Sequence, residues 1–78
     1  MKRKQIHFDS TDLRGMIKLM DKYGETSDTA FFGETEEGEE MLISITKDKI
    51  VTRVYQANNW IRVNTYWRDG TVEETFEK

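Results

Sequence analysis

The sequence predicts an α+β fold in which one N-terminal helix packs on one face of an antiparallel meander of about five strands, open or strongly curled. Three observations lead to this prediction. Apolar residues recur at helical spacing in the first third of the chain, apolar and polar residues alternate over residues 41–76, and short turn sequences interrupt the alternation. The 78 residues suffice for a single domain, residues 1–78.

The N-terminal part predicts a short strand and then a helix. Residues 4–8 are predicted to form the strand, with Ile6 and Phe8 on one side. Residues 9–11, Asp-Ser-Thr, offer N-cap oxygens to the unpaired amides of the first helical turn. Gly24 is predicted to end the helix in a left-handed conformation. The apolar stripe of this helix consists of Leu13, Met16, Ile17 and Met20.

The remainder predicts five strands joined by tight turns. The predicted strands cover residues 29–34, 41–46, 49–56, 60–68 and 71–76. Gly38 supplies a positive φ in the loop after the first of them. The three later connections are predicted to be two-residue turns at residues 47–48, 58–59 and 69–70. The Asp-Gly pair at 69–70 is the strongest hairpin signal in the chain.

Two-residue turns fix which residues face each other, because a slip of one residue exchanges the two faces of a strand. Under this register Val54 faces Val63, and Trp67 faces Val72. The apolar residues then share one face beneath the helix. The strand residues of this predicted core are Phe32, Ile43, Ile45, Val54, Ile61, Val63, Trp67 and Phe76.

The same register gathers arginines and aromatic residues on the opposite face, which a single helix leaves uncovered. We call these residues the basic–aromatic set: Arg53, Tyr55, Trp60, Arg62, Asn64, Tyr66 and Arg68. Such a face is consistent with a solvated sheet surface, a protein interface or a single-stranded nucleic-acid surface. Glu73 opposite Tyr66 and Glu77 opposite Arg62 disfavour nucleic acid, because they neutralise basic charge.

The loop after the first strand of the meander is strongly acidic. We call its glutamates the acidic loop: Glu34, Glu36, Glu37, Glu39 and Glu40. This pattern is consistent with a solvated hairpin tip, a docking patch for a basic protein surface, or a mimic of nucleic-acid phosphates. A calcium site is disfavoured because the spacing lacks the Asp-x-Asp-x-Asp-Gly ladder.

No pattern in the sequence indicates catalysis. His7 is the only histidine and cysteine is absent, so no thiolate or paired-histidine metal site is predicted. The serines have no recognisable His and Asp partners, and the glycines are too scattered to form a phosphate-binding loop. We therefore expect a protein that is not an enzyme and that has no cofactor or metal.

The charge is segregated along the chain. The net charge is -3, yet residues 25–40 carry seven acidic and no basic side chains. No signal peptide or apolar run of about 20 residues is apparent, so we expect a cytoplasmic protein that does not cross a membrane. Short, charge-segregated chains of this kind suggest, by association alone, an accessory protein of bacteria or their mobile elements.

These observations lead to one principal hypothesis. The chain is expected to be a small non-enzymatic binding module that regulates or inhibits a protein partner, through the basic–aromatic set or the acidic loop. Two alternatives remain. The first is single-stranded nucleic-acid binding through the aromatic and arginine face, and the second is an acidic phosphate mimic that inhibits a nucleic-acid enzyme.

Overall fold

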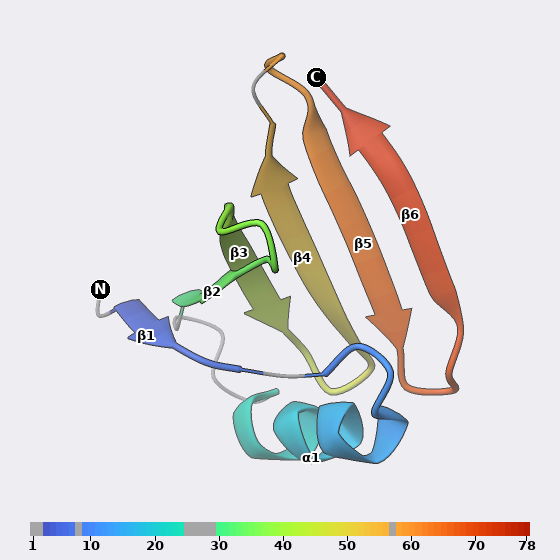
Figure 1. The fold of residues 1–78 in the computed structure, drawn as a ribbon. Coiled ribbons are helices and arrows are strands. Elements are labelled where there is room, and N and C mark those ends of the chain that lie inside the picture. The colour runs from blue at the N-terminus through green and yellow to red at the C-terminus, as the bar shows by residue number, and fades with distance from the viewer. Residues whose placement is uncertain (1–2, 8, 25–29, 57) are drawn as a thin grey trace.

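The computed structural model describes residues 3–7, 9–24, 30–56 and 58–78 (Figure 1). Its elements are β1 (Arg3–Gln5), α1 (Leu13–Tyr23), β2 (Ala30–Glu34), β3 (Glu40–Ile45), β4 (Lys49–Tyr55), β5 (Ile61–Trp67) and β6 (Val72–Glu77). The six strands follow one another in order across one sheet. β1 pairs with β2 in parallel and every later pair is antiparallel. The predicted α+β fold with a five-stranded antiparallel meander is therefore confirmed, with β1 as an added parallel edge.

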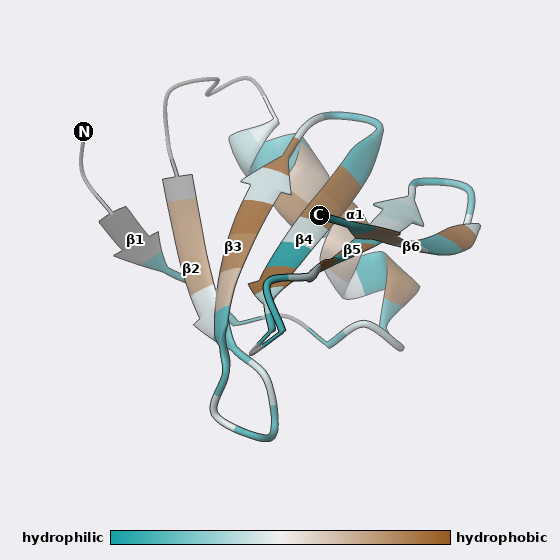
Figure 2. Ribbon diagram, turned by 90° about the horizontal axis from the view of Figure 1, so that it is seen from above, coloured by the Kyte–Doolittle hydropathy of each residue, from teal (hydrophilic) through white to brown (hydrophobic). Residues whose placement is uncertain are grey.

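The sheet is twisted and open. Strand direction changes progressively, so that β5 and β6 run across the direction of β2 (Figure 2). α1 lies at one end of the sheet near the β3–β4 turn, and the far ends of β4, β5 and β6 extend away from it (Figure 1). In the described part of the chain, β1 and β6 are the two edges, so the sheet is not closed.

The N-terminal strand is shorter than predicted, and the helix has a different cap. β1 ends at Gln5, although Ile6 N still donates to Phe32 O at 2.9 Å. Phe8 lies outside the described residues. The N-cap is Asp12, whose carboxylate accepts a hydrogen bond from Gly15 N at 3.1 Å.

The end of α1 also differs from the prediction. Gly24 has a φ of -64°, which is right-handed, so the expected left-handed cap is wrong. A Cβ at this position would lie 2.7 Å from Lys47 N in the β3–β4 turn. Glycine is therefore needed here for the close approach of the helix end to the sheet, rather than for its freedom at positive φ.

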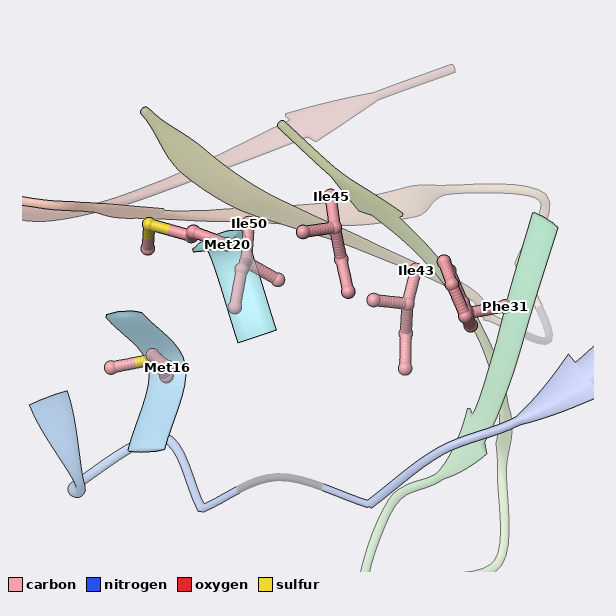
Figure 3. Close-up of a cluster of buried hydrophobic side chains, with 6 residues drawn as sticks. All are labelled: Met16, Met20, Phe31, Ile43, Ile45 and Ile50. Atoms are coloured by element: carbon pink, nitrogen blue, oxygen red, sulfur yellow. The ribbon is translucent and has the colours of Figure 1, made fainter. Parts of the chain in front are cut away.

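Six buried side chains form the centre of the core between α1 and the sheet (Figure 3). They are Met16, Met20, Phe31, Ile43, Ile45 and Ile50. The predicted helical stripe is right for the two methionines, but Leu13 is 37% exposed and Ile17 is half-buried. Leu19 and Tyr23 pack against the core from the same helix. Burying these side chains supplies most of the driving force that holds α1 on the sheet.

Three of the four hairpins share one loop geometry. In each of them three residues separate the closing pair, and the third residue has a left-handed φ: Gly38 (83°), Asn59 (68°) and Gly70 (94°). A three-residue loop that ends in a left-handed residue is a common hairpin connection. The β3–β4 turn alone has the predicted two-residue form, at residues 47–48.

The additional loop residue exchanges the two faces of β5 relative to the prediction. Val54 faces Arg62 rather than Val63. The β5–β6 loop adds a second shift of one residue, which returns Val72 and Phe76 to the face predicted for them, the one that α1 packs on. We call this side of the sheet the helix face and the other side the outer face. The strands whose two faces were exchanged by these shifts are thus β2 and β5.

Part of the predicted core is therefore wrong. The residues that lie on the outer face instead are Phe32, Ile61, Val63 and Trp67. Of these, Val63 is nevertheless buried as predicted, with 7% of its surface exposed. The three-residue β2–β3 loop exchanges the faces of β2 in the same way. Phe31, rather than Phe32, therefore faces Ile43 and is buried in the core, with 1% of its surface exposed. Trp67 is half-buried, and Lys49 Nζ lies 4.8 Å from the centre of its ring. Phe76 is on the helix face but 53% exposed, because α1 does not reach β6.

Candidate functional site

The register of β5 divides the basic–aromatic set between the two faces of the sheet. Arg62, Asn64 and Tyr66 lie on the helix face, whereas Arg53 and Tyr55 lie on the outer face. The prediction that the whole set shares one face is therefore wrong. The physical reason is the three-residue β4–β5 loop, which turns β5 over relative to β4.

Arg62 has a different environment from the predicted one. It faces Val54 on β4 and Phe76 on β6, and Glu77 faces Ile61. The expected neutralisation of Arg62 by Glu77 is therefore absent. The Arg62 side chain is half-buried, and within the described residues it forms no ion pair.

Arg68 has contacts that stabilise the fold. Its guanidinium donates hydrogen bonds to Asp21 Oδ1 on α1 at 2.8 Å and to the carbonyl of Lys47 at 3.0 Å. It thereby links the β5–β6 loop to the helix and to the β3–β4 turn. Both partners of the ion pair with Asp21 are exposed, so the pair stabilises the fold by at most about 1 kcal/mol.

Trp60 lies at the opposite end of β5 from Arg68. It borders a shallow hollow of about 380 Å³ together with Gln56, Asn58 and Phe76. Lys78 Nζ lies 5.2 Å from the centre of the Trp60 ring, a cation–π contact. Trp60 is therefore separate from the other aromatic members of the set.

A larger cleft of about 440 Å³ opens on the helix face, and we call it the sheet cleft. Its lining residues from the sheet are Met41, Thr52, Val54, Arg62, Asn64 and Tyr66. The remaining lining residues come from the segment before α1 and from the end of β2 with its loop: Asp9, Ser10, Glu34, Thr35 and Glu36. Its volume lies within the range of about 300–1,000 Å³ that is usual for ligand sites.

The sheet cleft joins parts of both surfaces predicted from the sequence. Glu34 and Glu36 of the acidic loop and Arg62 of the basic–aromatic set line the same cavity. With Asp9, the lining holds three carboxylates and one guanidinium. The local field therefore favours a cationic group, while Arg62 offers a second contact to an acceptor.

The floor of the sheet cleft is polar where a core would be apolar. Asn64 Nδ2 donates to the Tyr66 hydroxyl at 3.3 Å, and Thr52 is only 3% exposed. Asn64 Oδ1 is buried and has no hydrogen-bond partner among the described residues. An unpaired buried acceptor costs about 1–3 kcal/mol, and such exceptions to local consistency concentrate at functional sites.

Asp9 is held in its ionised form at the edge of the sheet cleft. The Thr11 hydroxyl and the Thr11 backbone N–H donate to Asp9 Oδ1 at 2.6 and 2.8 Å. These two hydrogen bonds, with the hydroxyl as the larger cause, lower the pKa of Asp9 below its ordinary value. A carboxylate is therefore present at this position at neutral pH.

The rest of the acidic loop lies outside the cleft. Figure 2 shows the hydrophilic loop between β2 and β3 projecting from the sheet. Thr35 orders it, because its hydroxyl accepts from Glu39 N at 3.1 Å. Glu37, Glu39 and Glu40 do not line the cleft. No group of three or more metal-ligating side chains is found in the described residues, which include the whole acidic loop.

Several residues of the sheet cleft were missed as site residues. In the sequence Asp9 and Ser10 have the pattern of helix caps and Val54 that of an apolar strand residue, so none of them indicates a binding site. Thr52 carried a usable signal: it is the polar residue between Ile50 and Val54 on a face that is otherwise apolar. A polar residue at an otherwise apolar position is an exception to the pattern that a functional role can explain.

Comparison with known proteins gives no further assignment. No protein-family model, curated protein or solved structure matches this chain. None of the helices in the described residues is both long and apolar enough to cross a membrane. The site is therefore interpreted from its own geometry.

Proposed function

We propose that this chain is a small, non-enzymatic, cytoplasmic binding module that regulates or inhibits a protein partner, and that the sheet cleft receives a side chain of that partner. The observation that carries the proposal is the position of Glu34 and Glu36 in the same open cavity as Arg62, which forms no ion pair within the described residues.

The chemistry of the sheet cleft fits a basic side chain of a protein. Met41 and Val54 offer apolar contact to the aliphatic stem of a lysine or arginine, and the surrounding carboxylates offer acceptors to its charged end. Arg62 can bind a carboxylate or carbonyl of the same partner segment. A few apolar side chains surrounded by polar and charged ones are typical of a specific protein interface.

The nucleic-acid alternative loses its main support. That hypothesis depended on one face of arginines and stacking aromatic rings, and the set is divided between two faces. The two carboxylates beside Arg62 also repel phosphate. The phosphate-mimic alternative retains the exposed glutamates of the acidic loop, but it does not use the cleft.

The test is an affinity capture with matched variants. Glu34→Lys/Glu36→Lys reverses charge inside the sheet cleft, and Glu37→Lys reverses one charge on the same loop outside it. We expect the first variant to lose at least one partner that the wild type and Glu37→Lys both retain. Circular dichroism verifies that all three chains are folded.

Identical sets of captured proteins from all three folded chains would contradict the cleft as the binding site. A separate fluorescence titration of Trp60 and Trp67 with oligonucleotides at low salt tests the nucleic-acid alternative. Phosphate contacts are strongest at low salt, so nucleic-acid binding would be most visible there. We expect no change in emission under this condition, because the proposed partner is a protein.

A further inference from the structure

β6 is an exposed edge of the sheet. It lies at one margin of the sheet (Figure 1), with no strand beyond it in the described part of the chain, and all six of its residues are exposed. An edge strand presents backbone groups that can pair with a strand of another chain. Six residues are enough for an incoming strand of ordinary length.

The hydrogen bonds of the β5–β6 hairpin show which groups of β6 point outward. Trp67 N donates to Thr71 O at 2.8 Å, so Thr71 points its backbone toward β5. Because antiparallel pairing alternates along a strand, the backbone N–H and C=O groups of Val72, Glu74 and Phe76 point away from β5. These three residues can each form two hydrogen bonds with an added strand.

The side chains of β6 give that edge a distinct chemistry on each face. Val72 and Phe76, which are 55% and 53% exposed, lie on the helix face with Glu74 between them. Glu73 and Glu77 lie on the outer face. An incoming strand would therefore meet two apolar side chains and three carboxylates.

Two copies of this chain are poorly matched along this edge. Two symmetric antiparallel pairings of β6 (Val72–Glu77) overlap equally: in one, Glu74 of one copy faces Glu74 of the other, and in the second, Glu73 faces Glu77. Like charges directly opposite each other destabilise a strand pair, whereas opposite charges stabilise it. The glutamates thus disfavour self-association and favour a basic strand.

We infer that β6 accepts an extended basic segment of a partner protein as a seventh, antiparallel strand. This inference rests on the proposed function, because it assumes a protein partner, but it uses a surface separate from the sheet cleft. The segment carries apolar residues opposite Val72 and Phe76 and lysine or arginine opposite Glu73, Glu74 and Glu77. Backbone hydrogen bonds supply affinity in this mode, and the alternating side chains supply specificity.

The test uses the end-capped peptide Lys-Val-Thr-Lys-Lys-Val, whose first residue is placed opposite Glu77. In NMR titrations of the isotope-labelled chain, we expect shifts and slowed hydrogen exchange at the amides of Val72, Glu74 and Phe76. N-methylation of peptide residues 2, 4 and 6 removes donors to β6, and we expect at least about tenfold weaker binding. N-methylation of residues 1, 3 and 5, whose amides point away, serves as the matched control.

Equal binding of the two N-methylated peptides would overturn the inference, as would an absence of shifts along β6 or shifts confined to the sheet cleft. Concentration-dependent shifts at β6 without peptide would show self-pairing and would contradict the argument from charge.

Affinity capture with Glu74→Lys separates this inference from the proposed function. If Glu74→Lys retains every partner that Glu34→Lys/Glu36→Lys loses, the function through the cleft stands and the β6 inference is overturned. If Glu74→Lys loses a partner that Glu37→Lys retains, β6 is supported whatever the cleft variant does.

Discussion

At the scale of single residues, two exposed aspartates stabilise their turns through local hydrogen bonds. Asp9 accepts from the hydroxyl and backbone of Thr11, and Asp69 accepts from Thr71 N at 2.9 Å. The Thr11 hydroxyl and then its amide lower the pKa of Asp9, and the Thr71 amide and then its hydroxyl lower that of Asp69, from an ordinary value of 3.8. A carboxylate whose pKa is lower in the folded than in the unfolded state stabilises the fold at pH values above its unfolded-state pKa. This stabilisation is lost as the pH falls through the folded-state pKa.

We therefore expect the free energy of unfolding to fall as the pH decreases below 3.8, with part of the fall due to these two groups. The variant Asp9→Asn/Asp69→Asn keeps an acceptor oxygen in each turn but has no charge to lose. Its stability should depend less steeply on pH, as measured by urea denaturation at neutral pH and at about pH 3. An unchanged pH dependence would show that neither aspartate contributes.

Asn64 gives a second prediction at this scale. Its Oδ1 is buried without a partner in the described residues, and its Nδ2 makes a long hydrogen bond of 3.3 Å to Tyr66. Asn64→Leu removes the unpaired acceptor and keeps the number and branching of the side-chain heavy atoms, so we expect unchanged stability or a gain of up to about 1 kcal/mol. Thermal denaturation measures the difference. A loss of more than about 1 kcal/mol would mean that the oxygen has a partner in solution.

At the scale of elements, the hairpin loops determine the arrangement of the site. Asn59 and Gly70 were correctly identified as turn residues from the sequence. A left-handed residue at the end of the loop is required by the two-residue type I′ turn and also by the three-residue loop. The dipeptides Asn-Asn and Asp-Gly are therefore compatible with both lengths, and the sequence does not distinguish them. This ambiguity of one residue is the source of the error in β5.

Gly38 tests the loop geometry most cleanly. Its φ is 83°, and a Cβ built there would meet no atom within 4 Å. Gly38→Ala therefore introduces backbone strain without a steric clash, and we expect a loss of about 1 kcal/mol in the free energy of unfolding. Glu37→Ala is the control in the same loop and should change stability by less than about 0.5 kcal/mol. Equal effects of the two substitutions would show that Gly38 does not need positive φ.

At the scale of the whole molecule, the fold class was predictable because its main signals are redundant. Met16 and Met20 follow helical periodicity, and Ile43, Ile45 and Ile50 follow strand alternation around a two-residue turn that was assigned correctly. The local sequence pattern of these elements agrees with their packing in the whole fold, and this agreement allowed them to be predicted correctly. Slips of one residue in three of the loops did not change the layers or the order of the strands.

The sheet cleft was not predictable in the same way. It combines Asp9, Glu36 and Arg62, which come from three separate segments of the chain. Their proximity depends on the register of β5 and on the path of the chain before α1, and neither leaves a periodic signal in the sequence. Composition indicated which residue types were available for binding, whereas only the structure showed which of them meet.

The register of β5 places Arg62, Asn64 and Tyr66 in the lining of the sheet cleft, and this register can be measured directly. In this register Arg53 and Val63 form a pair without mutual hydrogen bonds, because Gln56 N donates to Trp60 O three positions away along β4. Such pairs bring the Cα atoms within about 4.5 Å and give intense Hα–Hα nuclear Overhauser effects. We expect an intense Hα–Hα cross-peak between Arg53 and Val63. An intense cross-peak between Val54 and Val63 in its place would contradict this register of β5.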